Sequence, residues 1–232
     1  MLSLINRLSW RLQSRHIGGI PRFASKVYDK LATRLITGMY SFIAQEIIDS
    51  QLKPNILVDV GCSSVRLFKT LHEMVYSPMF MVGIDISKFM TNIALRNMKR
   101  NDLQSFVDIV QADAHNLPIR ESSVDLLLSS GTLHHLSDSQ TFFKECIRVL
   151  KDRGEAWIFE LSHDVPKDEE EIGKRMFRRP KVLLKLASAL HGIPRLECER
   201  GGLRSALEKS RCHYEISYHG FLTKLILRRS YE

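Results

Sequence analysis

Three aspartates are spaced so that a parallel α/β fold would bring them to one edge of its sheet. Asp59, Asp85 and Asp113 lie near the ends of successive short apolar runs, and they are 26 and 28 residues apart. A carboxylate at the carboxyl end of a strand can accept hydrogen bonds from a ribose diol or an adenine amine. Each aspartate alone is more often a cap or turn residue. Three in register, one in each strand–helix unit, indicate a nucleotide-type site.

The first apolar run leads into a turn with the sequence VDVGCSSV, Val58–Val65. An acidic residue followed by glycine and a helix is typical of nucleotide-type sites, because glycine lets backbone N–H groups approach a ligand. The turn keeps Gly61 but has Ser63 and Val65 in the later places of a glycine-rich fingerprint. Ser63 is tolerated there if its φ is negative and costs strain if its φ is positive. Taken alone, the turn is a weak indication.

Short apolar runs alternate with helical patterns through the middle of the chain. Strands are expected at Asn55–Val60, Met79–Ile84, Phe106–Gln111, Val124–Ser129 and Glu155–Leu161, and helices at Ser64–Tyr76, after the N-cap Ser87, and at Asp138–Leu150. This alternation predicts a Rossmann-like, doubly wound α/β fold with a mostly parallel sheet. Two further runs, His213–Tyr218 and Leu222–Arg228, are joined by a turn too short for a crossover helix, so they must pair antiparallel.

The helical insert at residues 163–210 interrupts this alternation after the fifth strand. Ligands of open α/β sheets bind outside the carboxyl ends of the strands, so we expect the insert to act as a lid. Residues 1–50 are predicted to form an N-terminal helical cap, and residues 51–232 the main domain. The length of 232 residues fits one large α/β domain better than two full domains.

The net charge of +8 lies in the flanks of the chain. Residues 1–50 carry +4, residues 51–160 carry −1 and residues 161–232 carry +5. Basic flanks favour an anionic substrate, a nucleic acid or a membrane surface, and solvated faces kept for solubility fit about as well. The acid-free N-terminal segment places arginines at helical spacing, at Arg7, Arg11 and Arg15. A helix resting on a membrane, an organelle transit peptide and a helix packed on the domain all fit that pattern.

The cysteines argue against a structural zinc site, and no metal is expected. Cys62, Cys146, Cys198 and Cys212 form no C-x-x-C pair and have no histidines at finger-like spacing. Four scattered cysteines indicate a reducing compartment, so we expect a cytoplasmic protein, with a membrane-peripheral location as the alternative. No run approaches about 20 apolar residues, so no membrane-spanning helix is predicted.

Four segments, in order along the chain, resemble motifs of the class I S-adenosylmethionine-dependent methyltransferases, close to their small-molecule type 11 branch. VDVGCSS resembles the first motif, GIDIS the acidic second motif, QADAHNLPIRESSVDLLLSSGTLHHL the third motif with its following strand, and ECIRVLKDRGEAWIFE the segment before strand five. The resemblance runs from about Asn55 to Leu161 and includes the C-terminal hairpin. The family usually has G-C-G-x-G at Gly61–Val65 and Pro-Gly-Gly at Asp152–Gly154, and this chain departs from both patterns.

The resemblance implies S-adenosylmethionine as the cofactor and suggests a role for each matching residue. The methionine end would lie against Asp59, Gly61, Cys62 and Ser63, near backbone groups of Ser129 and Ser130. Asp85 would hold the ribose hydroxyls with Ile86 against the adenine, and Asp113 and Ala114 would meet the adenine edge.

Methyl transfer asks little of catalytic side chains, because the sulfonium is already activated and positioning supplies most of the acceleration. A general base is needed only where the nucleophile is protonated at the working pH. The candidates are His134, His135 and His163, expected after strands four and five. Tyr28 and Tyr40 in the N-terminal cap are further candidates for contact with the substrate, although most such aromatic residues belong to a core.

The predicted function is methyl transfer to a small molecule, anionic or lipid-like, beneath the insert. The alternatives are a non-catalytic relative that binds a partner through its basic flanks and, with less support, an RNA methyltransferase, since no aromatic and basic platform is visible. A dehydrogenase is disfavoured by the missing glycines and the terminal hairpin. The basic cluster Lys174, Arg175, Arg178 and Arg179 is expected to recruit an anionic acceptor or a membrane surface.

Overall fold

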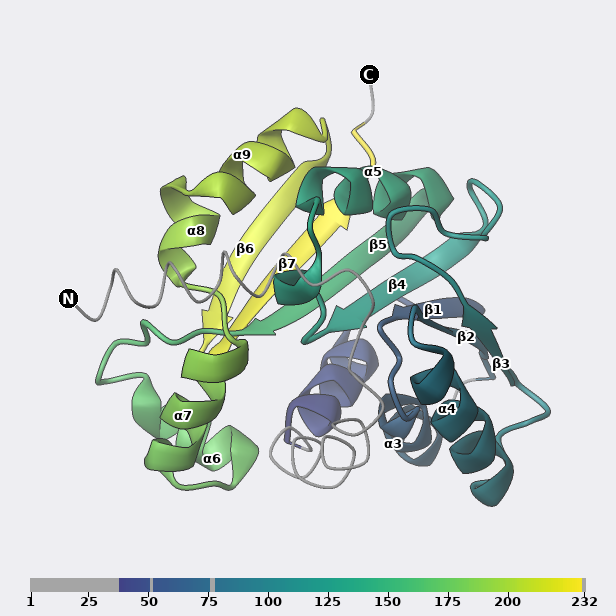
Figure 1. Cartoon of the computed structure of the whole chain (residues 1–232), viewed down its shortest axis with the longest axis horizontal. Helices are drawn as coiled ribbons and strands as arrows, with labels where there is room; N and C mark the ends of the chain where they lie inside the picture. The colour runs from purple at the N-terminus through teal and green to yellow at the C-terminus, as the bar shows by residue number, and fades with distance from the viewer. Residues whose placement is uncertain (1–37, 51, 76–77, 231–232) are drawn as a thin grey trace.

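The computed structural model describes residues 38–50, 52–75 and 78–230, and these contain one seven-stranded mixed sheet (Figure 1). The strand order is β3-β2-β1-β4-β5-β7-β6. The strands are β1 Ile56–Val60, β2 Phe80–Asp85, β3 Val107–Gln111, β4 Val124–Ser130, β5 Leu150–Leu161, β6 His213–His219 and β7 Leu222–Arg228. The first five strands run parallel, and β7 is antiparallel to both β5 and β6. The predicted fold class is confirmed, including the antiparallel hairpin.

Helices cover both faces of the sheet. They are α3 Arg66–Met74, α4 Lys88–Arg100, the 3₁₀ helix η1 Leu133–His135, α5 Ser139–Val149, α6 Glu170–Phe177, α7 Lys181–His191, α8 Arg195–Arg200 and α9 Gly202–Lys209, and residues 38–49 are also helical. Ser87 caps α4 as predicted, since its side chain accepts a hydrogen bond from the Met90 N–H. None of the helices in the described part of the chain is long and apolar enough to span a bilayer.

Side chains of the central strands alternate between two cores, one on each face of the sheet. On β5, Trp157 and Phe159 belong to one core, and Ala156 and Ile158 to the other. Strands buried on both faces appear in the sequence as continuous apolar runs, which is why these strands were recognisable.

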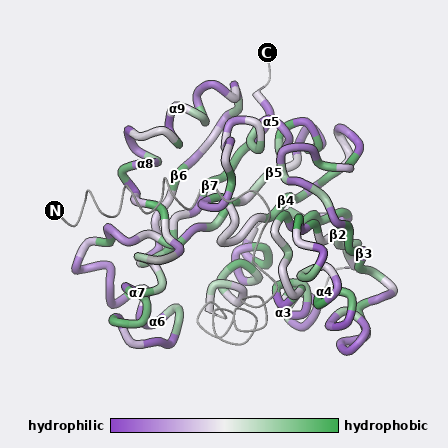
Figure 2. Tube along the Cα trace, viewed as in Figure 1, coloured by the Kyte–Doolittle hydropathy of each residue, from purple (hydrophilic) through white to green (hydrophobic). Residues whose placement is uncertain are grey.

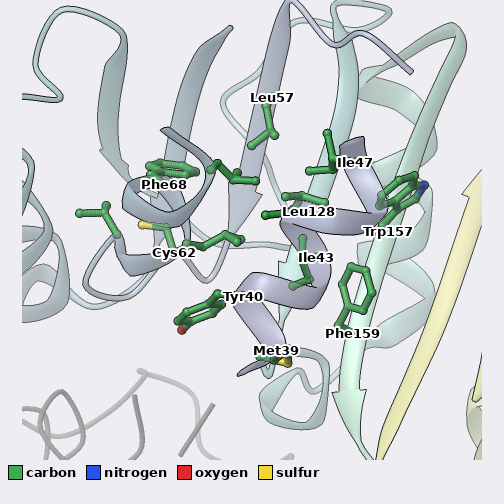
Figure 3. Packing of buried hydrophobic residues seen from close by; sticks show 14 of the residues in the cluster. Met39, Tyr40, Ile43, Ile47, Leu57, Cys62, Phe68, Leu128, Trp157 and Phe159 are labelled. Atoms are coloured by element: carbon green, nitrogen blue, oxygen red, sulfur yellow. The ribbon is translucent and has the colours of Figure 1, made fainter. Parts of the chain in front are cut away.

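The helix over residues 38–49 closes the first core. Figure 3 shows Ile43 and Ile47 from this helix facing Trp157 and Phe159 of β5. Tyr40 is buried in the same core, so its role is in packing. The other tyrosine considered, Tyr28, and the arginines Arg7, Arg11 and Arg15 lie outside the described residues, so the N-terminal cap remains a prediction.

The strand β5 begins at Leu150, five residues before the predicted start at Glu155. Its ladder with β4 shifts register between Val124 and Leu126. Gly154 lies at this irregularity, and a Cβ there would come within 2.7 Å of the Val124 carbonyl oxygen. The backbone contact explains why a glycine stays at 154 although the neighbouring residues depart from the family pattern.

The insert contains four helices, of which α6 and α7 project from one end of the sheet (Figure 1). Arg195 holds the base of this projection. Its guanidinium donates to both carboxylate oxygens of Glu169, at 2.9 and 2.7 Å, and to the Gly220 carbonyl at 2.7 Å. Asp164 accepts a further bond from the Arg195 backbone N–H at 2.7 Å. The segments that enter and leave the α6–α7 pair are therefore fixed to each other and to the β6–β7 turn.

Candidate functional site

The turn after β1 is bonded to the end of β2. The N–H groups of Gly61 and Cys62 both donate to the carbonyl oxygen of Ile84, at 2.7 and 3.0 Å. Gly61 has a φ of +83°, and a Cβ there would lie 2.0 Å from the Oγ1 of Thr132. Both the left-handed backbone and the close approach of the loop after β4 therefore require glycine at 61.

Ser63 and Val65 also have left-handed backbones, with φ of +49° and +57°. Ser63 therefore has the positive φ that costs strain, and not the negative φ at which serine is tolerated. Val65 is β-branched and buried, for which a positive φ is rare. The turn keeps the backbone path that glycines would take, at a cost of about 1–3 kcal/mol for each residue.

Asp85 ends β2, and its carboxylate joins the turn to the start of α4. Its Oδ2 accepts a hydrogen bond from the Ser63 N–H at 3.1 Å, and its Oδ1 accepts one from the Ser87 N–H at 2.8 Å. Burial raises the pKa of Asp85, and the two N–H donors oppose that rise. Ile86 follows with an exposed side chain. An acidic group and an apolar surface thus lie side by side at the carboxyl end of β2.

Asp59 lies within β1, opposite Gly83 and Leu128, instead of at the end of the strand. Its side chain is 1% exposed, and its Oδ1 has no hydrogen-bond partner. Burial and the neighbouring Asp85 raise the pKa of Asp59 to about 8. A buried polar atom without a partner costs free energy, so Asp59 would gain from a polar or cationic ligand.

Cys62, Ser129 and Ser130 line the neighbouring strand ends. Burial raises the pKa of the Cys62 thiol far above its ordinary value, with Asp59 and Asp85 adding to the rise, so this cysteine stays neutral. Ser129 is buried and donates from its Oγ to the Val60 carbonyl at 3.0 Å, which ties β4 to the end of β1. Ser130 ends β4 and is half-buried.

Asp113 bonds to His115 instead of joining the buried acidic pair. Its Oδ1 accepts a hydrogen bond from the His115 N–H at 2.9 Å and lies 2.7 Å from the His115 Nδ1. Partial burial raises the pKa of Asp113, but these bonds lower it more, so the net shift is downward. Ala114 beside it is buried. Of the three aspartates, Asp59 and Asp85 are therefore coupled electrostatically, and Asp113 is satisfied by its own loop.

Two of the three predicted catalytic histidines lie together at the end of β4. The Nδ1 of His134 is 2.8 Å from the Oε2 of Glu160, and the Oε1 of Glu160 accepts a bond from the Leu133 N–H at 2.6 Å. The rings of His134 and His135 have centroids 3.9 Å apart, and the ring of His191 at the end of α7 is 5.7 Å from that of His134. Burial lowers the pKa of His191, as does His134, while Glu160 opposes this.

His163 lies apart from this group. It is half-buried in the loop after β5, and burial lowers its pKa against the opposing effect of Asp164. Among the described residues, the histidine cluster at the end of β4 consists of His134, His135 and His191 and does not include His163.

Residues 58–158 match the family model of a methyltransferase domain. The fold agrees with a crystal structure assigned as an S-adenosyl-L-methionine-dependent methyltransferase from Methanococcus maripaludis. That likeness covers 94% of this chain and 98% of the other, with a TM-score of 0.74 at 24% identity. The chain has the fold of the class I S-adenosylmethionine-dependent methyltransferases.

Other methyltransferases share parts of this chain or its whole fold. A demethylmenaquinone methyltransferase of Desulfitobacterium hafniense is 28% identical over 132 residues, which are 56% of this chain and 52% of that protein. The plantazolicin methyltransferase BpumL in complex with SAH shares the fold over 99% of this chain and 98% of that one, with a TM-score of 0.63 at 14% identity. The chain spans about half the length of the demethylmenaquinone methyltransferases it matches.

Two polar residues beside the candidate site, Glu160 and His191, were not predicted from the sequence. Glu160 is buried within the apolar run that forms the end of β5. A carboxylate in an apolar run that forms a strand buried on both faces needs a polar partner, so Glu160 could have been identified from the sequence as a candidate site residue. His191 ends an apolar helix in the insert and gave no signal of its own, since only the fold brings it to His134.

Proposed function

We propose that this domain binds S-adenosylmethionine at the carboxyl ends of β1 to β4 and transfers its methyl group to a small, lipid-like acceptor. The observation that carries the proposal is the buried Asp59 carboxyl group, whose Oδ1 has no hydrogen-bond partner, beside a left-handed turn. S-adenosylmethionine is cationic at its methionine end and supplies a methyl group already activated on sulfur. A cation beside Asp59 would stabilise its ionised form and remove the cost of the unpartnered oxygen.

The remaining residues of the strand ends fit the other parts of the cofactor. The Asp85 carboxylate is held by two backbone N–H groups and keeps lone pairs that can accept from ribose hydroxyls. The exposed Ile86 offers an apolar surface for the adenine, with Asp113 and Ala114 at its edge. Gly61, Cys62 and Ser63 would lie along the methionine end, with Ser129 and Ser130 behind it. These roles are part of the proposal.

The surface of the insert supports a lipid-like acceptor. Val182 and Leu186 on α7 are 75% and 57% exposed, and Ile172 on α6 is also exposed. Figure 2 shows that hydrophobic residues make up much of α7. The basic residue Lys174 lies on α6, and Arg178 is the C-cap residue of that helix. Exposed apolar residues beside cations suit the boundary of an anionic membrane, where a lipid-like acceptor would be found.

Where the acceptor needs deprotonation, His163 is the candidate base. Its lowered pKa leaves the imidazole neutral at pH 7, the form that takes a proton. The chain otherwise acts by positioning the reactants and excluding water. Replacement of His163 by Gln would lower turnover of a protonated acceptor and leave cofactor affinity unchanged.

Calorimetric titration with S-adenosylmethionine, and separately with NAD, tests the cofactor. We expect saturable binding of S-adenosylmethionine alone. Production of S-adenosylhomocysteine is then measured with a lipid quinol lacking one ring methyl group, carried in vesicles, and with a water-soluble catechol. Turnover with the quinol supports the proposal. Cofactor binding without turnover of either acceptor would favour the non-catalytic alternative, and binding of NAD in place of S-adenosylmethionine would reject the proposal.

A further inference from the structure

Three histidines from two distant parts of the chain meet at the carboxyl edge of the sheet. His134 and His135 belong to η1 after β4, and His191 ends α7 in the insert. One ring nitrogen from each lies within 4.8 Å of the others. We call these residues the three-histidine group.

His134 is the best-defined member of this group. Its side chain is 2% exposed, and its Nε2 is buried without a hydrogen-bond partner. Its other ring nitrogen, Nδ1, is bonded to Glu160. A carboxylate that holds one nitrogen of a histidine orients the ring and raises the basicity of the other nitrogen, which is the usual outer-shell arrangement of metal-binding histidines.

We propose that the three-histidine group binds a zinc-class divalent metal ion, with a fourth coordination position left for water or an oxygen ligand. Imidazole nitrogens are suitable ligands for Zn²⁺. Catalytic zinc sites typically have three protein ligands and one open coordination position. Tetrahedral ligands at zinc-to-nitrogen distances of about 2.0–2.1 Å lie roughly 3.3 Å apart. The half-buried rings of His135 and His191 can close the remaining distance by rotating about their side-chain torsions.

The backbone around the three-histidine group is already fixed. Next to His191, Gly192 pairs with Leu161 of β5, and the Ile193 N–H donates to the Leu161 carbonyl at 2.7 Å. Glu160, which orients His134, is the preceding residue of the same strand. The ligands are thus carried by elements anchored to one strand, which favours a defined metal geometry. A bound ion would also join the end of α7 directly to the loop after β4.

The site goes beyond the proposed methyl transfer and departs from the sequence-based expectation of no metal. That expectation rested on the cysteines, and all four are buried and outside the three-histidine group. The pairing of adjacent histidines with one 56 residues later has no sequence signature, because the crossover and the insert bring them together.

The test uses the full chain without a histidine tag, freed of metal by a chelator and dialysed. Calorimetry with Zn²⁺ gives the stoichiometry, and Co²⁺ gives a visible absorption band whose intensity reports tetrahedral nitrogen ligation. The variants are His135→Gln and His191→Gln, which leave the buried His134–Glu160 pair intact. The matched control is His213→Gln, an exposed histidine on β6. Circular dichroism and urea unfolding in chelator confirm that each variant is folded.

We expect one Zn²⁺ per chain, a tetrahedral Co²⁺ band, and loss of both in the two ligand variants but not in the control. Glu160→Gln should weaken metal binding by about 10- to 100-fold, the usual effect of an outer-shell partner. The proposal is overturned if the wild-type chain binds no Zn²⁺, if His191→Gln binds it as tightly as the wild type, or if His213→Gln loses it equally. None of these readouts depends on methyltransferase activity.

Discussion

The Asp85 carboxylate reaches back across the turn after β1, where its Oδ2 accepts a hydrogen bond from the Ser63 backbone N–H at 3.1 Å. This bond fixes the turn against the end of β2, since the second oxygen is held by the Ser87 N–H. A hydrogen-bond acceptor is thus in place before any ligand arrives. The arrangement makes Asp85 both a constraint on the turn and the proposed partner of the ribose.

Replacement of Asp85 by alanine should weaken S-adenosylmethionine binding. The lost interaction is a hydrogen bond to a charged group, worth about 1.5–3 kcal/mol, or roughly 10- to 150-fold in Kd. Calorimetry measures the change. Asp152→Ala, at the opposite end of the sheet where Asp152 pairs with Arg229, is the control and should bind normally. Equal affinity of Asp85→Ala and wild type would reject the assigned site.

Glycine at position 63 should stabilise the protein, whereas glycine at position 65 should not. Ser63→Gly removes left-handed strain of about 1–3 kcal/mol, part of which is offset by the greater freedom of glycine in the unfolded chain. We therefore expect a net gain of about 0.5–1 kcal/mol in the free energy of unfolding. Val65→Gly relieves similar strain but loses a buried side chain worth about 1.5–3 kcal/mol, so its stability should fall. Urea unfolding compares the two. A loss of stability in Ser63→Gly would contradict the strain argument.

The same Ser63→Gly variant separates the catalytic proposal from its alternative. If the strained turn is already competent, cofactor affinity should change little when the strain is removed. A large gain in affinity would indicate a turn that has drifted from a binding conformation, which is the expectation for a non-catalytic relative.

The raised pKa of Asp59 predicts that the ligand-free protein becomes less stable as pH rises. Between pH 4 and 8 the unfolded chain has released this proton and the folded chain retains it, so the proton favours the folded state at low pH. One such group lowers the free energy of unfolding by up to about 1.4 kcal/mol per pH unit in that window. Asp59→Asn should remove this slope. Parallel pH profiles for both proteins in urea unfolding would show that Asp59 ionises normally.

Two substitutions on the insert should separate charge from apolar contact in membrane binding. Arg178→Gln with Arg179→Gln should reduce binding to anionic liposomes at low salt and have little effect at high salt, where screening is strong. Val182→Ser with Leu186→Ser should reduce binding at both, since burial of these exposed side chains does not depend on salt. Cofactor affinity should be unchanged in both variants.

The control for the insert is Lys99→Gln with Arg100→Gln, at the last turn of α4. The alternative is that acidic residues of the insert neutralise its basic side chains, so that these do not attract a membrane. Lys174 and Lys181 both pair with Glu171, at 3.7 and 2.6 Å. Unchanged liposome binding in both insert variants would show that the basic and apolar residues serve only the fold and solubility of the insert.

The strands were predictable because burial on both faces gives β1, β4 and β5 continuous apolar runs, and the Ser87 cap because its local bonding needs no distant partner. Features that depend on tertiary structure could not be predicted from the sequence. The left-handed φ of Ser63 belongs to a turn whose N–H at Ser63 is bonded to Asp85 on the next strand, a contact that the sequence does not show. His191 meets His134 only because α7 returns to the sheet. Sequence therefore located the carboxyl-edge aspartates and could not assemble the three-histidine group.

The ion pair between Lys224 and Glu46 has a consequence for the order of folding. Lys224 on β7 is buried, donates to the Glu46 Oε2 at 2.6 Å and lies over the ring of Trp157. Its partner was synthesised 178 residues earlier, and β7 also supplies the antiparallel neighbour that β5 needs. During synthesis, neither contact can form until residues 222–228 have left the ribosome. Until then Glu46 lacks its lysine partner and the edge of β5 lacks its neighbouring strand. A nascent chain stalled before that point would expose a hydrophobic strand edge, and would be a substrate for chaperones or for aggregation.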